Sequence, residues 1–328
     1  MDTRILSRRE VLKGGLALAL AGHSLESGAR GWPERPVRLV VPSAAGGSPD
    51  AICRILAAEL TKSLKQSVVI DNQPGSSGNV GMLEVLRAAP DGYTLGYGNV
   101  VTLAINRHLH KETRYAPEDF TGVALLGTVQ NALIVRNSLP VSSVKELISY
   151  GKSNPGALTM GSAGIGTTGH LGGELFRTMT GINLVHVPYR GSPAAFSDML
   201  IGKVDLMFDN LSSCGGHIKS QRVRALGVSG AKRAPTFPLV PTIQEAGVKG
   251  YETTSWGGIV GPKGLPGDVV DRLNTEINHI LAKPAVRELY KEISFESMAS
   301  VPNLIMTIAM VESKRWEGVI RRSGTKLD

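Results

Sequence analysis

The fold is decided by one stretch near the start of the chain, Val37-Arg-Leu-Val-Val-Pro-Ser-Ala-Ala-Gly-Gly-Ser-Pro-Asp50. Its first six residues, 37–42, are rich in β-branched residues and predict a strand, and a loop of small residues follows. From residue 50 to 64 apolar residues recur at helical spacing, with Ser48 as the expected N-cap and a proline in the first turn. Residues 66–72 return to strand character. The order strand, loop, helix, strand predicts two parallel neighbours in an α/β sheet.

The same unit recurs in the middle of the chain. Residues 158–161 predict a strand, 162–169 a loop and 170–179 a helix, and a second strand is expected at 184–188. Further helices are expected at 143–152, 192–200, 266–281 and 302–320, and a further strand at 204–208. Strands that alternate with helices predict an α/β fold of mostly parallel sheets flanked by helices.

Two long strand-like runs, 125–135 and 251–261, lead into the second half of this pattern and out of it. If both cross between two α/β lobes, residues 32–130 and 254–328 form the first lobe and residues 131–253 the second. A tandem of two domains fits the periodicity equally well, so the interleaved order stays an expectation.

Length and composition agree with two domains. The chain has 328 residues, 42% of them apolar and 20% charged, which is typical of a globular protein. The longest apolar run, residues 14–22, is far shorter than the roughly 20 residues of a membrane-spanning helix, so an integral membrane protein is not expected. Basic residues are not clustered with aromatic ones, so no nucleic-acid partner is expected.

The first thirty residues have features of an export signal. Arg8-Arg9 precedes the apolar run 14–22, which is the layout of a Tat export signal, so residues 1–30 are expected to be removed and the protein to reach the periplasm. The alternative is a basic helix of the fold. Without this segment 31 basic residues stand against 25 acidic ones, a net charge of +6. That charge favours anionic ligands, or serves solubility alone.

The two cysteines, Cys53 and Cys214, could pair in an oxidising compartment, but their contexts favour free thiols. Cys53 belongs to an apolar helical pattern, and Cys214 to a glycine-rich turn. No CxxC or CxxH spacing is present, so no metal site is expected.

Two loops have the composition of anion sites. In the first, Gly46 and Gly47 leave backbone N–H groups uncovered directly before a helix, whose N-terminal end attracts negative charge. In the second, Thr167 or Thr168 is the expected N-cap. His170 then lies in the first helical turn, either as a neutral donor to a ligand carboxylate or as a packed core histidine. The alternative for both loops is capping and turn formation without a ligand.

The second loop also contains G-x-G-x-x-G, at Gly164, Gly166 and Gly169, between a strand and a helix. The acidic residue expected about 20 residues later is absent, although Arg190 could accept a 2′-phosphate. An exported NADP-dependent oxidoreductase therefore remains an alternative. The sequence has no G-x-S-x-G nucleophile elbow, no HExxH metalloprotease motif and no P-loop.

Motifs over nearly the whole chain after residue 30 resemble one known family. They are Trp32-Pro33, Val41-Pro42 with Gly46-Gly47 and Asp50, Asn72 with Pro74-Gly75, Pro90-Asp-Gly-Tyr-Thr-Leu95, His170-Leu171 with Glu174-Leu-Phe176, His186-Val-Pro-Tyr189 with Gly191, Arg224-Ala-Leu226, Pro241-Thr242 with Glu245-Ala-Gly247, and Trp256 with Gly258. On these motifs the chain resembles the Bug family of tripartite tricarboxylate transporter receptors, which are periplasmic solute-binding proteins. The resemblance implies a two-lobe periplasmic-binding-protein fold of type II that closes on its ligand like a flytrap, with no catalysis and no cofactor.

The resemblance also implies the ligand and its surroundings. Family ligands are mostly small carboxylates, with some amides and aromatic acids, handed to membrane permease subunits or reported to a sensor protein; a monomer is expected. The ligand-binding residues carried over are Ser43, Ala45, Gly46, Gly47, Ser48, Asp50, Asn99, Ser162, Gly166, Thr167, Thr168, His170, Tyr189, Arg190, Gly191 and Asp209.

Two features bear on which ligand is bound. Ser43 stands where the family usually has Phe or Tyr, which enlarges the expected site and makes it more polar. If Asp50 or Asp209 faces the cleft ionised, an amino or amide group on the ligand is favoured. The alternatives are that Asp50 compensates the helix N-terminus and that Asp209 holds the turn at the end of its strand.

Overall fold

The computed structural model describes residues 31–110 and 113–323. The contacts within the chain divide it into Met1–Trp32 and Pro33–Asp328, and every helix and strand below belongs to the second unit. The predicted export signal, residues 1–30, lies outside the described residues. In the described ranges no helix is both long enough and apolar enough to cross a bilayer.

Within the described residues ten strands form one mixed sheet, whose main path runs β2-β1-β3-β9-β4-β7-β5-β6, with β8 and β10 also paired to β4. The strands are β1 (Val37–Val41), β2 (Val68–Asn72), β3 (Thr94–Asn99), β4 (Phe120–Arg136), β5 (Leu158–Ser162), β6 (Leu184–Pro188), β7 (Leu206–Asn210), β8 (Val223–Val228), β9 (Thr254–Pro262) and β10 (Glu296–Ser297). Strands β1, β2 and β3 pair in parallel, as do β5, β6 and β7. The predicted α/β class is confirmed.

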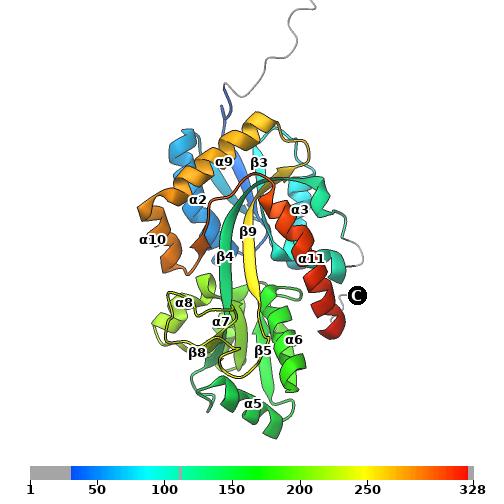
Figure 1. Cartoon of the computed structure of the whole chain (residues 1–328), viewed down its shortest axis with the longest axis vertical. Helices are drawn as coiled ribbons and strands as arrows, with labels where there is room; N and C mark the ends of the chain where they lie inside the picture. The colour runs from blue at the N-terminus through cyan, green and yellow to red at the C-terminus, as the bar shows by residue number, and fades with distance from the viewer. Residues whose placement is uncertain (1–30, 111–112, 324–328) are drawn as a thin grey trace, which may run out of the picture. The chain divides into compact units, whose positions relative to one another are not determined.

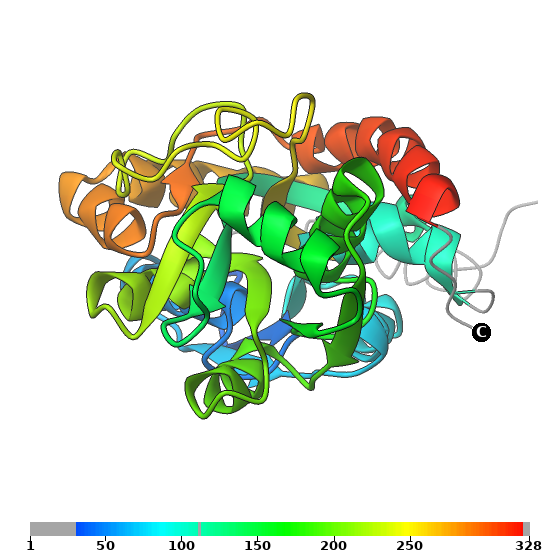
Figure 2. The same cartoon turned by 90° about the horizontal axis from the view of Figure 1, so that it is seen from below.

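Helices cover both faces of this sheet (Figure 1). They are α2 (Ser48–Leu64), α3 (Asn79–Leu86), α4 (Asn106–Leu109), α5 (Val144–Ser153), α6 (Thr168–Thr180), α7 (Ser192–Leu200), α8 (Leu211–Lys219), α9 (Gly267–Ala282), α10 (Pro284–Glu292) and α11 (Leu304–Ser323), with short turns η1 (Ser76–Gly78), η2 (Val101–Ile105) and η3 (Pro117–Asp119). Figure 2 shows α11, in red, beside α6, in green, and the two helices are in contact.

Two strands join the two halves of the sheet. Residues 120–130 of β4 pair with β9, whereas residues 131–136 of the same strand pair with β7 and β8. We call the β2-β1-β3-β9-β4 part the first lobe and the β4-β7-β5-β6 part the second lobe; β4 and β9 run side by side through the middle of Figure 1. This is the expected two-lobe fold. We keep the lobe limits, 32–130 with 254–328 and 131–253, as a proposal that the change of partners along β4 supports.

Each lobe has its own apolar core. In the first lobe Trp256, Val260 and Leu103 pack with residues of α11 such as Trp316. In the second lobe the core contains Phe176, Phe208 and Tyr251 in ring contact. The large apolar side chains are thus used for two cores, and small residues are left for the loops between them.

Several local predictions need correction. The N-cap of α2 is Gly47 and not Ser48, because the extended conformation of Gly47 (φ −81°, ψ 172°) lies just outside the helix and Ser48 is already its first residue. Helices α3, α4, α8 and α10 and strands β3, β8 and β10 were not predicted. The favoured expectation of free thiols is confirmed, because Cys53 and Cys214 are both buried and unpaired.

Candidate ligand-binding site

A cavity of about 780 Å³ is lined by residues of both lobes. Its walls come from the loops that follow β1, β2 and β3 in the first lobe and β5, β6 and β7 in the second, together with the start of β9. The carboxyl ends of parallel strands meet at one edge of a sheet, so the loops after them converge. The interleaved chain therefore makes one shared site from six loops far apart in the sequence.

Four helices begin at this cavity. Residues of the first turn or N-cap line it in α2 (Gly47 and Ser48), α6 (Thr167 and Thr168), α7 (Gly191 and Ser192) and α8 (Asn210). Each of these helices has nine residues or more. The dipole of each helix start favours a negative charge. Their convergence makes the cavity attractive to an anion without a buried cation.

The loop before α2 is held by a buried carboxylate. Asp50 accepts hydrogen bonds from the Gly46 N–H at 2.9 Å, from Nε of Arg54 at 2.9 Å and from Nδ2 of Asn72 at 3.1 Å. Burial raises the pKa of Asp50, but these hydrogen bonds outweigh burial and hold it below the usual value. Asp50 is therefore committed to the loop, as the helix-compensation alternative predicted.

The loop before α6 is held by two histidines. The hydroxyl of Thr167 caps the helix by accepting from the His170 N–H, and Nδ1 of His170 accepts from the Gly166 N–H at 3.0 Å. The ring of His170 stacks on His186 at 4.0 Å between centroids, and Nε2 of His186 is 2.7 Å from the hydroxyl of Ser162. Burial lowers the pKa of His170 to about 3 and that of His186 to about 4, so both rings are neutral at physiological pH.

This geometry disfavours the dinucleotide interpretation. The N–H of Gly164 donates to the Ser162 hydroxyl at 3.2 Å, and the N–H of Gly166 donates to His170. A pyrophosphate needs such N–H groups free at the mouth of the loop. The loop uses them internally instead.

Asp209, at the end of β7, is the other buried carboxyl of the site. Its Oδ1 accepts from the hydroxyl of Ser192 at 2.7 Å, while Oδ2 has no partner among the described residues. Burial raises its pKa to about 6, and no ion pair to it is present in the described ranges. The turn-holding role predicted for Asp209 agrees with its bond to Ser192 at the start of α7, and its raised pKa makes the site sensitive to pH.

Direct contacts join the lobes around the cavity. The hydroxyl of Ser48 bonds to that of Ser212, and the hydroxyl of Ser77 donates to the carbonyl oxygen of Ile165. Gly191 has a φ of +105°, and a Cβ there would lie 2.9 Å from Cβ of Ala44. Glycine is required at this close approach between the lobes.

Ten of the predicted residues line the cavity, namely Ser43, Gly47, Ser48, Asn99, Thr167, Thr168, Tyr189, Arg190, Gly191 and Asp209. Six do not: Ala45, Gly46, Asp50, Ser162, Gly166 and His170. Of these six, Gly46, Asp50, Ser162, Gly166 and His170 fix the shape of the two loops through the hydrogen bonds above. Ligand contact for the ten that line the cavity stays a prediction.

The sequence reasoning missed part of the wall. Unpredicted lining residues include Ser76, Ser77, Tyr97, His110, Ser255 and Trp256. Ser76 and Ser77 have φ of +45° and +54° and follow the Pro74-Gly75 motif, which could have signalled a third loop. Tyr97, Ser255 and Trp256 belong to strands, and only the tertiary structure brings them to the cavity.

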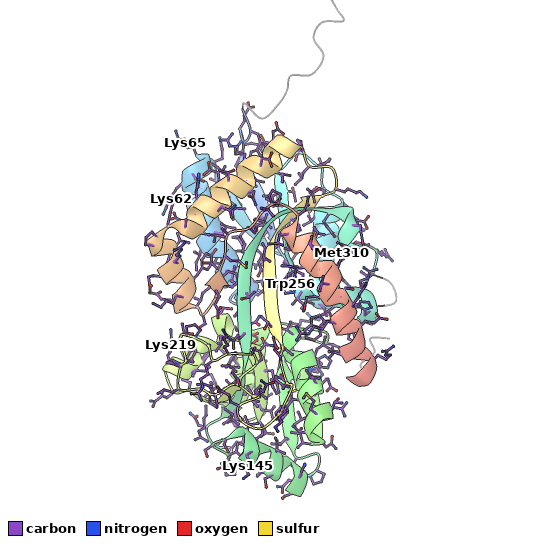
Figure 3. The ribbon with its side chains drawn as sticks, in the orientation of Figure 1. Lys62, Lys65, Lys145, Lys219, Trp256 and Met310 are labelled. Carbon is purple, nitrogen blue, oxygen red and sulfur yellow. The ribbon has the colours of Figure 1, made fainter. Side chains whose placement is uncertain are left out.

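Figure 3 shows Trp256 on β9 in the middle of the molecule, whereas the labelled lysines Lys62, Lys65, Lys145 and Lys219 lie on its outside. In the described ranges Arg190 is the single Lys or Arg that lines the cavity, and its side chain is exposed. The remaining polar groups of the wall are neutral donors and helix ends, apart from the carboxyl of Asp209.

Comparison with known proteins finds one matching family and several relatives of similar length. The profile of a family described as "Tripartite tricarboxylate transporter family receptor" matches residues 52–325. A UPF0065 protein from the tcbD-tcbE intergenic region of Pseudomonas sp. (strain P51) is 38% identical over 97% of this chain and 95% of its own length. Protein BugT of Bordetella pertussis is 33% identical over 95% of this chain and 97% of its own length.

Solved structures give the same result. Rpa4515 of R. palustris, determined with adipate, is 40% identical with a TM-score of 0.87 and covers 89% of this chain and 98% of its own. The periplasmic binding protein BugD is 34% identical with a TM-score of 0.86, covering 90% and 99%. MatC of Rhodopseudomonas palustris with bound malate is 30% identical with a TM-score of 0.82, covering 88% and 100%.

Proposed function

This chain belongs to the tripartite tricarboxylate transporter receptor family, and we propose that it captures a small organic anion, a mono- or dicarboxylate, in the cavity between its lobes for uptake by a transporter of that type. The observation that carries the proposal is the convergence of four helix N-termini on one cavity. Such a site binds a carboxylate reversibly.

The binding free energies expected for single contacts support a site built from several loops. One helix end stabilises an anion by about 0.3–2 kcal/mol. A charge-assisted hydrogen bond adds about 1.5–3 kcal/mol. A micromolar dissociation constant needs about 8 kcal/mol after the cost of association. One loop is therefore too weak, and closure of the two lobes over the ligand supplies the rest as a ligand-driven shift in population.

The similar structures agree with this ligand class. Rpa4515 was determined with adipate and MatC with malate, and each is a dicarboxylate. BugD is a periplasmic binding protein, which supports a periplasmic location here. Export by a Tat-type signal in residues 1–30 and delivery to a membrane permease are parts of the proposal.

A thermal-shift experiment tests the binding itself. Adipate and malate, each compared with its neutral diamide, are added to the protein without residues 1–30. A ligand at a hundred times its Kd stabilises the folded state by about 2.7 kcal/mol. We expect a rise in Tm of about 4 °C or more with a carboxylate and none with its diamide. Equal shifts with acid and diamide, or no shift with any carboxylate at millimolar concentration, would contradict the proposal.

Carboxylate affinity is expected to rise as the pH falls from 8 to 6. The buried Asp209 has a pKa of about 6, and a bound anion in the same cavity raises it further because two negative charges oppose each other. The complex then takes up a proton that the free protein lacks, and adipate stays mainly ionised in this range. Calorimetry should show a gain of about three- to tenfold in the wild type and a flat profile in Asp209→Asn. A wild-type affinity independent of pH would refute the coupling.

A further inference from the structure

The loop after β2 has an unusual backbone. Its residues 75–78 all have positive φ, with values of +133°, +45°, +54° and +88°. Glycine adopts such angles freely and occupies the first and last of these positions, but the two middle ones are Ser76 and Ser77. A serine in the left-handed region is unfavourable and persists only where its surroundings hold it there. Two such residues in succession at the wall of the cavity indicate that this conformation has a function.

A buried network holds the loop in this conformation. Nδ2 of Asn106, a side chain with no exposed surface, donates to the carbonyl oxygen of Ser77 at 3.0 Å and to Oδ1 of Asn79 at 2.7 Å. The hydroxyl of Tyr115 donates to the same Oδ1 at 2.7 Å. All four residues belong to the first lobe. The loop is thus fixed by contacts within its own lobe.

The side chain of Ser77 points from this loop to the other lobe. Its hydroxyl donates to the carbonyl oxygen of Ile165, in the loop before α6, and the two residues are 88 positions apart in the chain. The N–H groups on either side of Ile165 in that loop, those of Gly164 and Gly166, are bonded within the second lobe. The bond of Ser77 therefore joins two loops that are each held firmly by their own lobe.

We propose that Ser77 is a latch between the lobes: its hydroxyl holds the loop before α6 against the first lobe when the lobes close, and so slows the release of a carboxylate bound between them. This inference rests on the proposed function, because a bound carboxylate is what the latch retains. Ser77 is a positioning residue, since it acts through the loop of Ile165 and needs no bond to the ligand. The left-handed backbone is the means by which its hydroxyl reaches the second lobe.

Two other polar contacts between the lobes fit this role less well. Ser48, which bonds to Ser212, belongs to the start of α2, where the ligand itself is expected. Ser255, which bonds to Thr168, lies on β9, one of the two strands that join the lobes, so lobe opening moves it little. Ser77 follows β2, which is separated from β9 by β1 and β3 in the sheet. Opening about the joining strands therefore separates Ser77 from its partner.

The test compares two variants of Ser77 with a matched control. Ser77→Ala and Ser77→Gly both remove the hydroxyl, but glycine adopts the left-handed conformation without strain and alanine does not. Gln221→Gly is the control, because Gln221 has φ +55°, is exposed and does not line the cavity. The protein is that of the thermal-shift experiment, and the ligand is adipate or malate, whichever gives the larger shift there.

We expect both Ser77 variants to bind the carboxylate about three- to tenfold more weakly, as the loss of one neutral hydrogen bond predicts. Stopped-flow tryptophan fluorescence, to which Trp256 of the cavity wall contributes, should place this loss in the dissociation rate. The association rate should stay within twofold, because the latch forms after the ligand has entered. Gln221→Gly should match the wild type in both rates.

Stability separates the latch from a purely structural role. Ser77→Gly should melt at a higher temperature than Ser77→Ala, because only alanine is strained at this position. If the hydroxyl is the cause, the two variants lose affinity equally despite this difference in Tm. If Ser77 only maintains the shape of the loop, affinity follows stability and Ser77→Gly binds as the wild type does.

A distance measurement tests closure directly. Spin labels at Lys62→Cys in the first lobe and Lys145→Cys in the second lie on the outside of the molecule, whereas the native thiols are buried (Figure 3). With saturating carboxylate, pulsed electron paramagnetic resonance should show both Ser77 variants shifted toward the distance distribution that the wild type has without carboxylate. Gln221→Gly should keep the distribution of the bound wild type.

Three results would overturn the inference and leave the proposed function standing. They are wild-type dissociation rates and distances in both Ser77 variants, a loss of affinity confined to Ser77→Ala, and a wild-type distance distribution that carboxylate leaves unchanged, since there is then no closure to latch. Failure of the wild type to bind any carboxylate would instead reject the proposed function, and this inference with it.

Discussion

Gly47→Asp is expected to abolish carboxylate binding while the protein stays folded. Gly47 is the N-cap of α2 with φ −81° and ψ 172°, a conformation that aspartate adopts readily at this position. A Cβ there would meet the Ala44 carbonyl oxygen at 3.3 Å, which a small shift relieves. The new carboxylate would occupy the helix start that the ligand needs. Calorimetry with adipate should show a loss of about a hundredfold or more, on the order of 3 kcal/mol.

Ser143→Asp provides the matched control. Ser143 is the N-cap of α5 and does not line the cavity, so the same charge is added to a helix start without touching the ligand. Both variants should keep Tm within a few degrees of the wild type, because aspartate is a good N-cap. If Gly47→Asp binds adipate as tightly as Ser143→Asp does, the start of α2 is not part of the site.

Among the variants proposed in this article, Gly258→Val is expected to cause the largest loss of folding stability. Gly258 lies in β9, where the strand pairs with Leu125 of β4 and with Gly98 of β3. A Cβ at residue 258 would lie 2.0 Å from the carbonyl oxygen of Ala124 and 2.8 Å from Cα of Leu125. Backbone atoms of a central strand cannot move away without breaking the ladder that joins the lobes. We expect the free energy of unfolding to fall by about 3 kcal/mol or more.

Urea unfolding measures this loss, and Gly216→Ala is its control. Gly216 is inside α8, and a Cβ there meets nothing within 4 Å. Alanine should therefore stabilise the protein by about 0.5–1 kcal/mol, since the unfolded chain loses freedom and no contact is disturbed. A Gly258→Val protein as stable as the wild type would show that β4 and β9 tolerate a wider separation than the structure has.

Local elements could be predicted from local sequence. Strand β1, the glycine loop and α2 followed from the order of apolar, small and helix-forming residues, and the cap at Thr167 followed from its position before a helical pattern. These features depend on neighbours within a few residues, so the sequence contains all the information they need. Helix α8 was harder to predict, because it begins directly after β7 with no residue between them.

Side-chain roles could not be predicted in the same way. Asp50 and Asp209 are both buried carboxyls, but Asp50 meets Arg54 and Asn72 while Oδ2 of Asp209 meets no described partner. His170 lies in the predicted helical turn, yet its ring turns to Gly166 and His186 and not to the cavity. Asn72, which bonds Asp50, lies 22 residues from it in the chain, and His186, which stacks on His170, belongs to a different strand. Local sequence does not show that these residues meet.

By itself the sequence determined the strand–loop–helix units, the neutral and glycine-rich character of the two main loops, and, through its motifs, the family. Only the tertiary structure decided that four helix starts share one cavity, that Ser77 bonds across it to Ile165, and that Tyr97, Ser255 and Trp256 of the strands line it. The reason is physical: propensity and capping act over a few residues, whereas a closed site depends on which distant strands pair, and here that depends on β4 and β9.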